Sequence, residues 1–104
     1  SYNLLIEQNN FLKMQKEKEL NEQLNFWISE YESTQFIINN YTNTLLANAK
    51  KIERIATLQL NNGEIDYFKW VVLIHQSISI QSDYLQFINQ QNNAIIQLQK
   101  LQNK

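Results

Sequence analysis

Apolar and aromatic residues recur at alternating spacings of four and three residues over two long stretches of this chain. A 3.5-residue period is typical of helices that pack along a continuous seam and supercoil with a left hand. The first predicted seam consists of Leu20, Leu24, Trp27, Tyr31, Thr34, Ile38, Tyr41, Leu45, Asn48, Ile52 and Ile55. The second consists of Tyr67, Val71, Ile74, Ile78, Gln81, Leu85, Ile88, Asn92, Ile95 and Gln99. Residues 13–22, rich in Lys and Glu, are expected to be a more solvated helical end.

The break between the two seams contains Gly63, the only glycine of a chain that has no proline. Gly63 suits the left-handed position just past a helix end, and Asp66 suits the N-cap of the next helix. Ile65 and Trp70 have the spacing of a hydrophobic staple. A β-hairpin is the competing interpretation, because Asn62-Gly63 lies between two short alternating stretches. The helical period on both sides favours a turn between helices.

The predicted fold is therefore all-α: a single antiparallel coiled-coil hairpin that spans residues 1–104. One helix is expected over about 3–60, a turn over 61–66 and a second helix over 67–102. Two helices cannot enclose the apolar residues outside the seams, so we expect further helices to complete the fold through oligomerisation, with a dimeric four-helix bundle for this chain alone. Those residues are Phe26, Ile28, Phe36, Ile37, Leu46, Phe68, Val72, Leu73, Ile80 and Phe87.

Charge and composition exclude several functional classes. A formal net charge of −1 and a pI near 5.7 do not provide the positive field that nucleic acids require. The absence of cysteine excludes disulfides and thiolate metal sites. No apolar run is long enough to cross a bilayer. The chain begins Ser1-Tyr2 without a leader, so we expect a mature or excised piece.

No catalytic, cofactor or metal site is predicted. His75 is the sole histidine and is expected to be packed in a structural role, and Met14 stands alone among Lys and Glu. Glu64 and Asp66 are explained by the electrostatics of a helix start. The basic cluster of Lys50, Lys51 and Arg54 is explained by its favourable interaction with the dipole at the end of the first helix, together with ordinary solvation.

The turn and the second helix carry a further pattern: Leu58-x-Leu-Asn-Asn-Gly63-Glu-Ile-Asp-Tyr67, Ile78-Ser-Ile-x-Ser-Asp-Tyr84-Leu85 and Asn92-Asn-x-Ile95-Ile96-x-Leu98. This pattern resembles the TolC-like outer membrane efflux family, in particular the members that serve heavy-metal resistance-nodulation-division (RND) pumps. The resemblance covers about residues 47–101. In that family three protomers combine, each giving a few strands to an outer-membrane barrel and long helices to a periplasmic tunnel.

The resemblance implies that this chain is one tunnel hairpin of a trimeric channel, in the periplasmic part of an outer membrane protein of a Gram-negative bacterium. Its partners would be an adaptor protein and an inner-membrane RND pump that exports heavy-metal cations. Asn62, Gly63, Glu64 and Ile65 would form the tip at which the adaptor hairpins dock.

Two features depart from the family pattern. The family often has a proline in the stretch equivalent to residues 44–47, which is Thr-Leu-Leu-Ala here, so the bend of such a proline does not carry over. Lys69 and Val72 occupy the places where some members carry acidic residues of a cation-sensitive gate, so that gate is not predicted.

Two other functions remain open at this point. The chain could be the hairpin of the adaptor itself, which is also a long coiled-coil pair, or a segment of a structural coiled-coil scaffold. An enzyme is the least favoured class, because no nucleophile, base and orienting group stand at plausible spacing.

Overall fold

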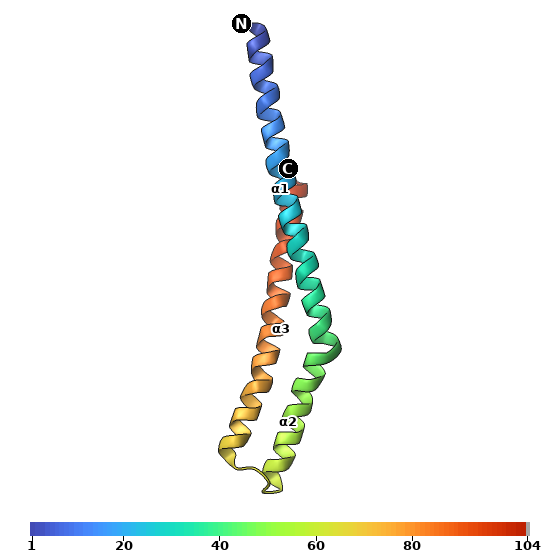
Figure 1. The fold of residues 1–104 in the computed structure, drawn as a ribbon, viewed down its shortest axis with the longest axis vertical. Helices are drawn as coiled ribbons and strands as arrows, with labels where there is room; N and C mark the ends of the chain where they lie inside the picture. Colours follow the sequence, from blue (N-terminus) through green and yellow to red (C-terminus); the bar gives the residue numbers. More distant parts are fainter. Residues whose placement is uncertain (104) are drawn as a thin grey trace.

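The computed structural model describes residues 1–103 as a rod of 88 × 22 × 17 Å (Figure 1). The elements in chain order are α1 (Tyr2–Asn40), the π-helical turn η1 (Tyr41–Leu45), α2 (Leu46–Asn61) and α3 (Tyr67–Gln102). Together α1, η1 and α2 form one long first helix, which runs antiparallel to α3. The predicted all-α helical hairpin is confirmed, and residues 1–103 contain no strand. The first helix extends one residue further at each end than the predicted 3–60, and α3 has the predicted bounds.

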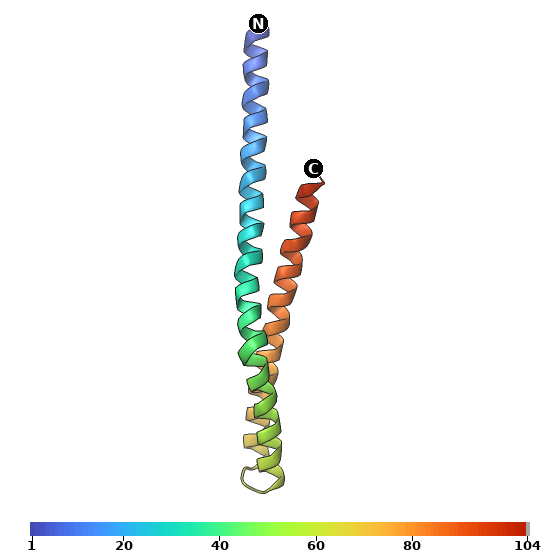
Figure 2. The ribbon, with the colours of Figure 1, turned by 90° about the vertical axis from the view of Figure 1, so that its right-hand side faces the viewer.

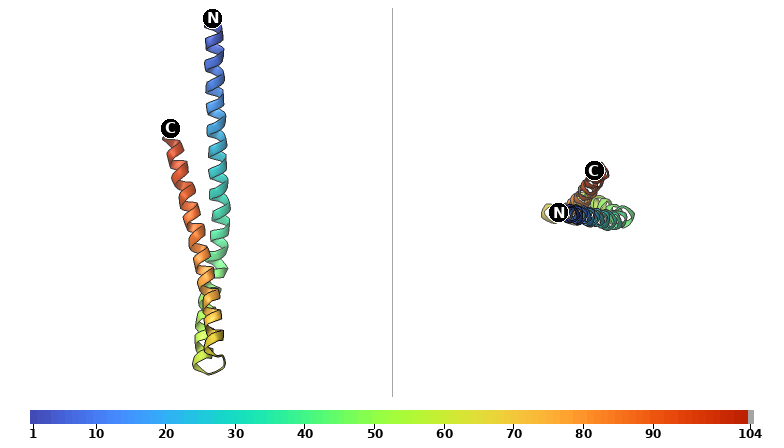
Figure 3. Two further views of the ribbon diagram at one scale, coloured as in Figure 1. Left: turned by 90° about the vertical axis from the view of Figure 1, so that its left-hand side faces the viewer. Right: turned by 90° about the horizontal axis from the view of Figure 1, so that it is seen from above.

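The N-terminal part of α1 extends well beyond the end of α3 (Figure 2). Residues 1–19 are all exposed, which agrees with the solvated helical end predicted for the Lys- and Glu-rich segment. Ser1 caps this end, its Oγ accepting a hydrogen bond from the Leu4 N–H at 3.3 Å. In the view of Figure 3 the two helices separate toward the C-terminus.

The π-helical turn η1 interrupts the first helix at the stretch where the TolC-like family often has a proline. No bend was predicted there, because this chain has no proline. The N–H of Leu46 bonds to the carbonyl of Tyr41, five residues back, so this turn holds one residue more than an α-helical turn. The rod changes direction at this turn (Figure 1). A bend therefore exists without proline, because an inserted residue in the hydrogen-bond ladder kinks a helix as well.

The extra residue in η1 shifts the seam of α2. Above η1 the predicted seam is correct, with Thr34 and Ile38 buried. Below it the predicted seam residues Asn48 and Ile55 are exposed, Ile55 by 41%, and the next residue along the chain is buried in each case. These buried residues are Ala49 and Ala56, at 0% and 1% exposure. The seam in α2 was thus predicted one residue too early.

The seam of α3 also differs from the prediction. Ser77 and Ala94 are fully buried, and the half-buried Tyr84 and Gln91 complete a seven-residue repeat with Ser77. Six of the ten predicted seam residues face solvent instead, among them Tyr67, Val71, Ile78 and Leu85, which are 69%, 41%, 52% and 59% exposed. Small side chains on both helices allow their backbones to approach closely, so α3 turns its small residues toward its partner. Several of its larger apolar residues, such as Ile78 and Leu85, are left outside.

A polar cluster lies in this closely packed part of the hairpin. The Ser77 Oγ lies 2.8 Å from the carbonyl oxygen of Ala49 and 2.8 Å from Oε1 of Glu53, so its single proton bonds to one of them at a time. The Gln81 Nε2 donates to the same Glu53 oxygen at 2.9 Å and lies 3.1 Å from Ser77 Oγ. The buried hydroxyl is therefore satisfied, and its bonds stabilise the register observed between α2 and α3.

Contacts of larger side chains begin at η1 itself. Tyr41 lies against Phe87 and Tyr84, with ring centroids 5.7 and 6.2 Å apart. Further toward the open end, Gln91 Nε2 donates to Gln35 Oε1 at 2.7 Å. The hairpin is therefore held by a single layer of contacts between its two helices. Few side chains in this layer are fully buried, and polar contacts occur along it at intervals.

Candidate docking tip and exposed apolar stripe

The turn at the end of the rod is built by the cap of α2. Gly63 has a φ of +73°, in the left-handed region that glycine adopts without strain. Its N–H donates to the Leu60 carbonyl at 3.1 Å, and the Glu64 N–H donates to the Gln59 carbonyl at 2.8 Å. This pair of bonds is the Schellman motif, which satisfies the last carbonyls of a helix. The β-hairpin alternative is wrong for this segment.

The start of α3 fixes the other side of the turn. Asp66 is the N-cap, as predicted, and its Oδ1 accepts a hydrogen bond from the Lys69 N–H at 2.7 Å. The Trp70 indole N–H donates to Thr57 Oγ1 at 3.2 Å and so ties α3 to α2 just above the turn. The turn is thus held by both helix caps and by one cross-helix side-chain bond.

The four residues predicted to dock a partner lie together at this end of the rod. Asn62, Gly63 and Glu64 are exposed, and Ile65 is half-buried. Phe68, in the first turn of α3, adds a side chain that is 76% exposed. The tip therefore offers a carboxylate, amides and an aromatic ring on a rigid backbone.

A second surface was not identified as such from the sequence. We call Tyr67, Val71, Ile78 and Leu85 the α3 stripe; these residues follow one face of α3 at spacings of four and seven. All four are exposed, although a 3.5-residue apolar repeat is the pattern that one helix buries against another. Between Lys69 and Lys100 the only formal charge of α3 is Asp83. The helix thus combines an unburied apolar stripe with a nearly uncharged polar surface.

The total exposed surface agrees with an incomplete core. The chain exposes 8192 Å², whereas a compact monomer of 12.4 kDa exposes about 6,100 Å². The difference of about 2,000 Å² exceeds the roughly 800 Å² that each partner buries in a stable interface of standard size. The first helix also leaves large side chains exposed outside the seam, notably Phe26 at 57% and Phe36 at 76%.

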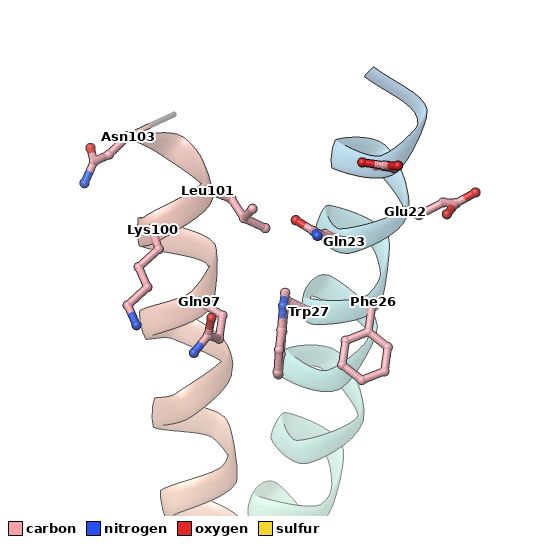
Figure 4. A pocket seen from close by; sticks show the side chains of 9 residues that line it. Glu22, Gln23, Phe26, Trp27, Gln97, Lys100, Leu101 and Asn103 are labelled. Atoms are coloured by element: carbon pink, nitrogen blue, oxygen red, sulfur yellow. The ribbon is translucent and has the colours of Figure 1, made fainter. Parts of the chain in front are cut away.

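A cleft of about 890 Å³ lies at the open end, where α1 and α3 diverge. Trp27 of α1 and Leu101 of α3 point into the space between the helices, and Lys100 and Gln97 lie on the α3 side (Figure 4). Glu22 points away from α3. The lining joins apolar and charged groups without any convergent donor set, so the cleft has the character of unfilled space between two helices.

The remaining residues singled out from the sequence lie on the surface of the rod. His75 is exposed, which corrects the packed role predicted for it, because it lies one residue beyond the contact face of α3. Met14 is 66% exposed, and the basic cluster of residues 50, 51 and 54 is exposed as well. Among residues 1–103, no group of His, Cys, Asp or Glu could hold a metal ion. None of the described helices is long and apolar enough to cross a membrane.

Comparisons with protein-family models, with curated proteins and with solved structures find no match to this chain.

Proposed function

We propose that this chain is one helical hairpin of the periplasmic tunnel of an outer-membrane efflux channel of the TolC-like type. The channel would belong to a tripartite system for heavy-metal cations, assembled as a trimer with an adaptor protein and an inner-membrane RND pump in a Gram-negative bacterium. The role is passive: the helices form a conduit wall, and no bond is made or broken by these residues.

The observation that carries this proposal is the exposed α3 stripe. A hairpin that functions alone buries its large apolar residues in its own seam, but here Ser77 and Ala94 occupy the seam of α3 while Val71, Ile78 and Leu85 face outward. Such a hairpin is suited to a wall of helices, in which neighbours cover the outer faces. The nearly uncharged polar surface of α3 suits either such contacts or a hydrated passage.

The tip supports the partner-docking part of the proposal. Gly63 and Asp66 give the turn a defined shape, and Glu64 is exposed at its end. Docking on a preformed turn loses less conformational entropy than docking on a mobile loop. A scaffold coiled coil that continues its heptads would contain no such turn, whereas a tip-to-tip contact between two hairpins would use it.

The experiment is photocrosslinking in cells that contain the intact protein together with its pump and adaptor. A photoreactive residue replaces the exposed Glu64 at the tip, and a matched control replaces the exposed Glu32 on the shaft. We expect the tip probe to label the hairpin of the adaptor and the shaft probe not to do so. Labelling of a channel tip would identify this chain as the adaptor hairpin. Absence of any tip adduct, with Glu32 labelling neighbouring copies, would favour a structural scaffold.

A further inference from the structure

The π-helical turn η1 separates two packing registers of α2, the one that the apolar repeat of the sequence predicts and the one that the structure adopts. The apolar repeat of the first helix continues through residues 41–45 without a break, and in an unbroken α-helix it would bring Asn48 and Ile55 to face α3. In the structure the extra residue in η1 brings Ala49 and Ala56 there instead. The sequence thus encodes a continuous seam, and the structure adopts the shifted one.

We propose that η1 is a register switch: the Tyr41–Leu45 turn alternates between its π form and an α form, and α2 packs against α3 in a different register in each. When the turn becomes α-helical, α2 advances by one residue. At 3.6 residues per turn and 1.5 Å per residue, α2 rotates by about 100° and moves by about 1.5 Å. This inference depends on the hairpin alone and not on the proposed transport role.

Each register has its own stabilising contacts. In the π register, Ser77 Oγ reaches the Ala49 carbonyl and the Glu53 carboxylate at 2.8 Å. In the α register those contacts are lost, but the side chain of Ile55, now 41% exposed, enters the seam. The change from the π to the α register thus replaces a hydrogen-bonded polar cluster by buried apolar surface. Side chains fill the interface between α2 and α3 in both registers.

The two registers differ in how closely the helices approach. Ala49 and Ser77 are both fully buried, and side chains of this size allow α2 and α3 to lie near each other. Asn48 and Ile55 are larger, so the α register holds the helices further apart near the tip. Packed helices change between such discrete arrangements instead of deforming continuously.

The switch also reaches the tip, about 24 Å from η1 along the 16 residues of α2. Advancing α2 by one residue pushes one more residue into the turn, which now spans residues 62–66. The bonds from the Gly63 and Glu64 N–H groups that cap α2 must then re-form around a longer turn.

Disulfide trapping in the intact protein tests the switch, because the chain has no cysteine of its own. The pair Ala49→Cys with Ser77→Cys reports the π register, and the pair Asn48→Cys with Ser77→Cys reports the α register. We expect both pairs to form on oxidation. Failure of the Asn48 pair, under conditions that close the Ala49 pair, would overturn the switch. Failure of the Ala49 pair would overturn it too, since the π register would then be absent.

Two further variants separate the switch from general flexibility. Deleting Asn43 removes the extra residue of η1, so the helix becomes continuous with Ala49 still facing Ser77. The Asn48 disulfide should be lost and the Ala49 disulfide kept, whereas the matched substitution Asn43→Ala should keep both. Ala56→Leu crowds the π register without shortening the chain, and it should shift trapping toward the Asn48 pair. If the deletion or Ala56→Leu leaves the yield of the Asn48 disulfide unchanged, that disulfide arises from fraying of the helices and not from the switch.

Discussion

Replacing Gly63 by alanine tests whether the tip depends on a left-handed backbone position. Gly63 has a φ of +73°, and a Cβ added there meets no atom within 4 Å beyond its own chain neighbours. Contact with the rest of the molecule therefore contributes nothing, and the effect is that of the local backbone conformation alone. An L-residue in the left-handed region is destabilised by about 1–2 kcal/mol. We expect Gly63→Ala to lower the free energy of unfolding by that amount.

Two companion variants isolate the cause. Asparagine adopts the left-handed region more readily than alanine, so Gly63→Asn should be destabilised less than Gly63→Ala. D-alanine, introduced by chemical ligation, favours positive φ, so it should restore or exceed the stability of glycine. Gly63 is exposed, which leaves solvent to receive the added methyl group. The order D-Ala, Gly, Asn, L-Ala is thus expected from backbone preference.

The assay is thermal and urea unfolding followed by far-ultraviolet circular dichroism, at fixed protein concentration because association changes apparent stability. For a domain of this size, each kcal/mol lowers Tm by about 4–8 °C. Equal loss with D-alanine and L-alanine would refute the argument, because it would mean that any side chain at this position is unfavourable. Unchanged stability with L-alanine would show that the Schellman turn does not persist in solution.

Three further predictions concern caps, the buried hydroxyl and the stripe. Asp66→Ala should lower the free energy of unfolding by about 0.5–2 kcal/mol through loss of the N-cap, and Asp66→Asn should preserve most of it, measured by urea unfolding. Ser77→Ala should lower it by about 0.5–1.5 kcal/mol, while the exposed Ser79→Ala should have no measurable effect; equal values would contradict the buried bond. Val71→Gln with Ile78→Gln should weaken self-association by about 0.6–1.6 kcal/mol per side chain that a partner covers, because only 41% and 52% of these residues remain exposed for a partner to bury, and analytical ultracentrifugation would detect it. A wild-type chain that stays monomeric and cooperatively folded would defeat that last expectation.

The overall fold could be predicted because few signals competed. One glycine and no proline leave only one place for a turn, and Gly63 and Asp66 occupy the positions that their conformational and capping preferences require. The 3.5-residue period then assigns both flanking stretches to helix. The geometry of the tip follows from the same residues, whereas its role in docking stays a prediction, because a cap motif specifies a backbone shape and not a partner.

The π-helical turn was not predicted because neither glycine nor proline marks it. The available signal was weaker: the segment Tyr-Thr-Asn-Thr within Tyr41–Leu45 has low helix propensity throughout. The seam of α3 was misplaced for a related reason. Large apolar residues dominate the periodic pattern, so the predicted seam followed Val71 and Ile78. The observed contact instead uses Ser77 and Ala94, whose small size allows close packing.

The misplaced seam and the exposed stripe have one origin. A helix with two unlike faces can satisfy two kinds of neighbour: small residues such as Ser77 pair with Ala49 within the hairpin, and the α3 stripe remains for a helix outside it. Because the inner contact is thin and includes polar bonds, its register is held less firmly than that of a large apolar core. A neighbour that covers the stripe can therefore stabilise the hairpin as a whole while η1 still selects between two registers of α2. Assembly and tip shape would then be controlled by different faces of the same helices.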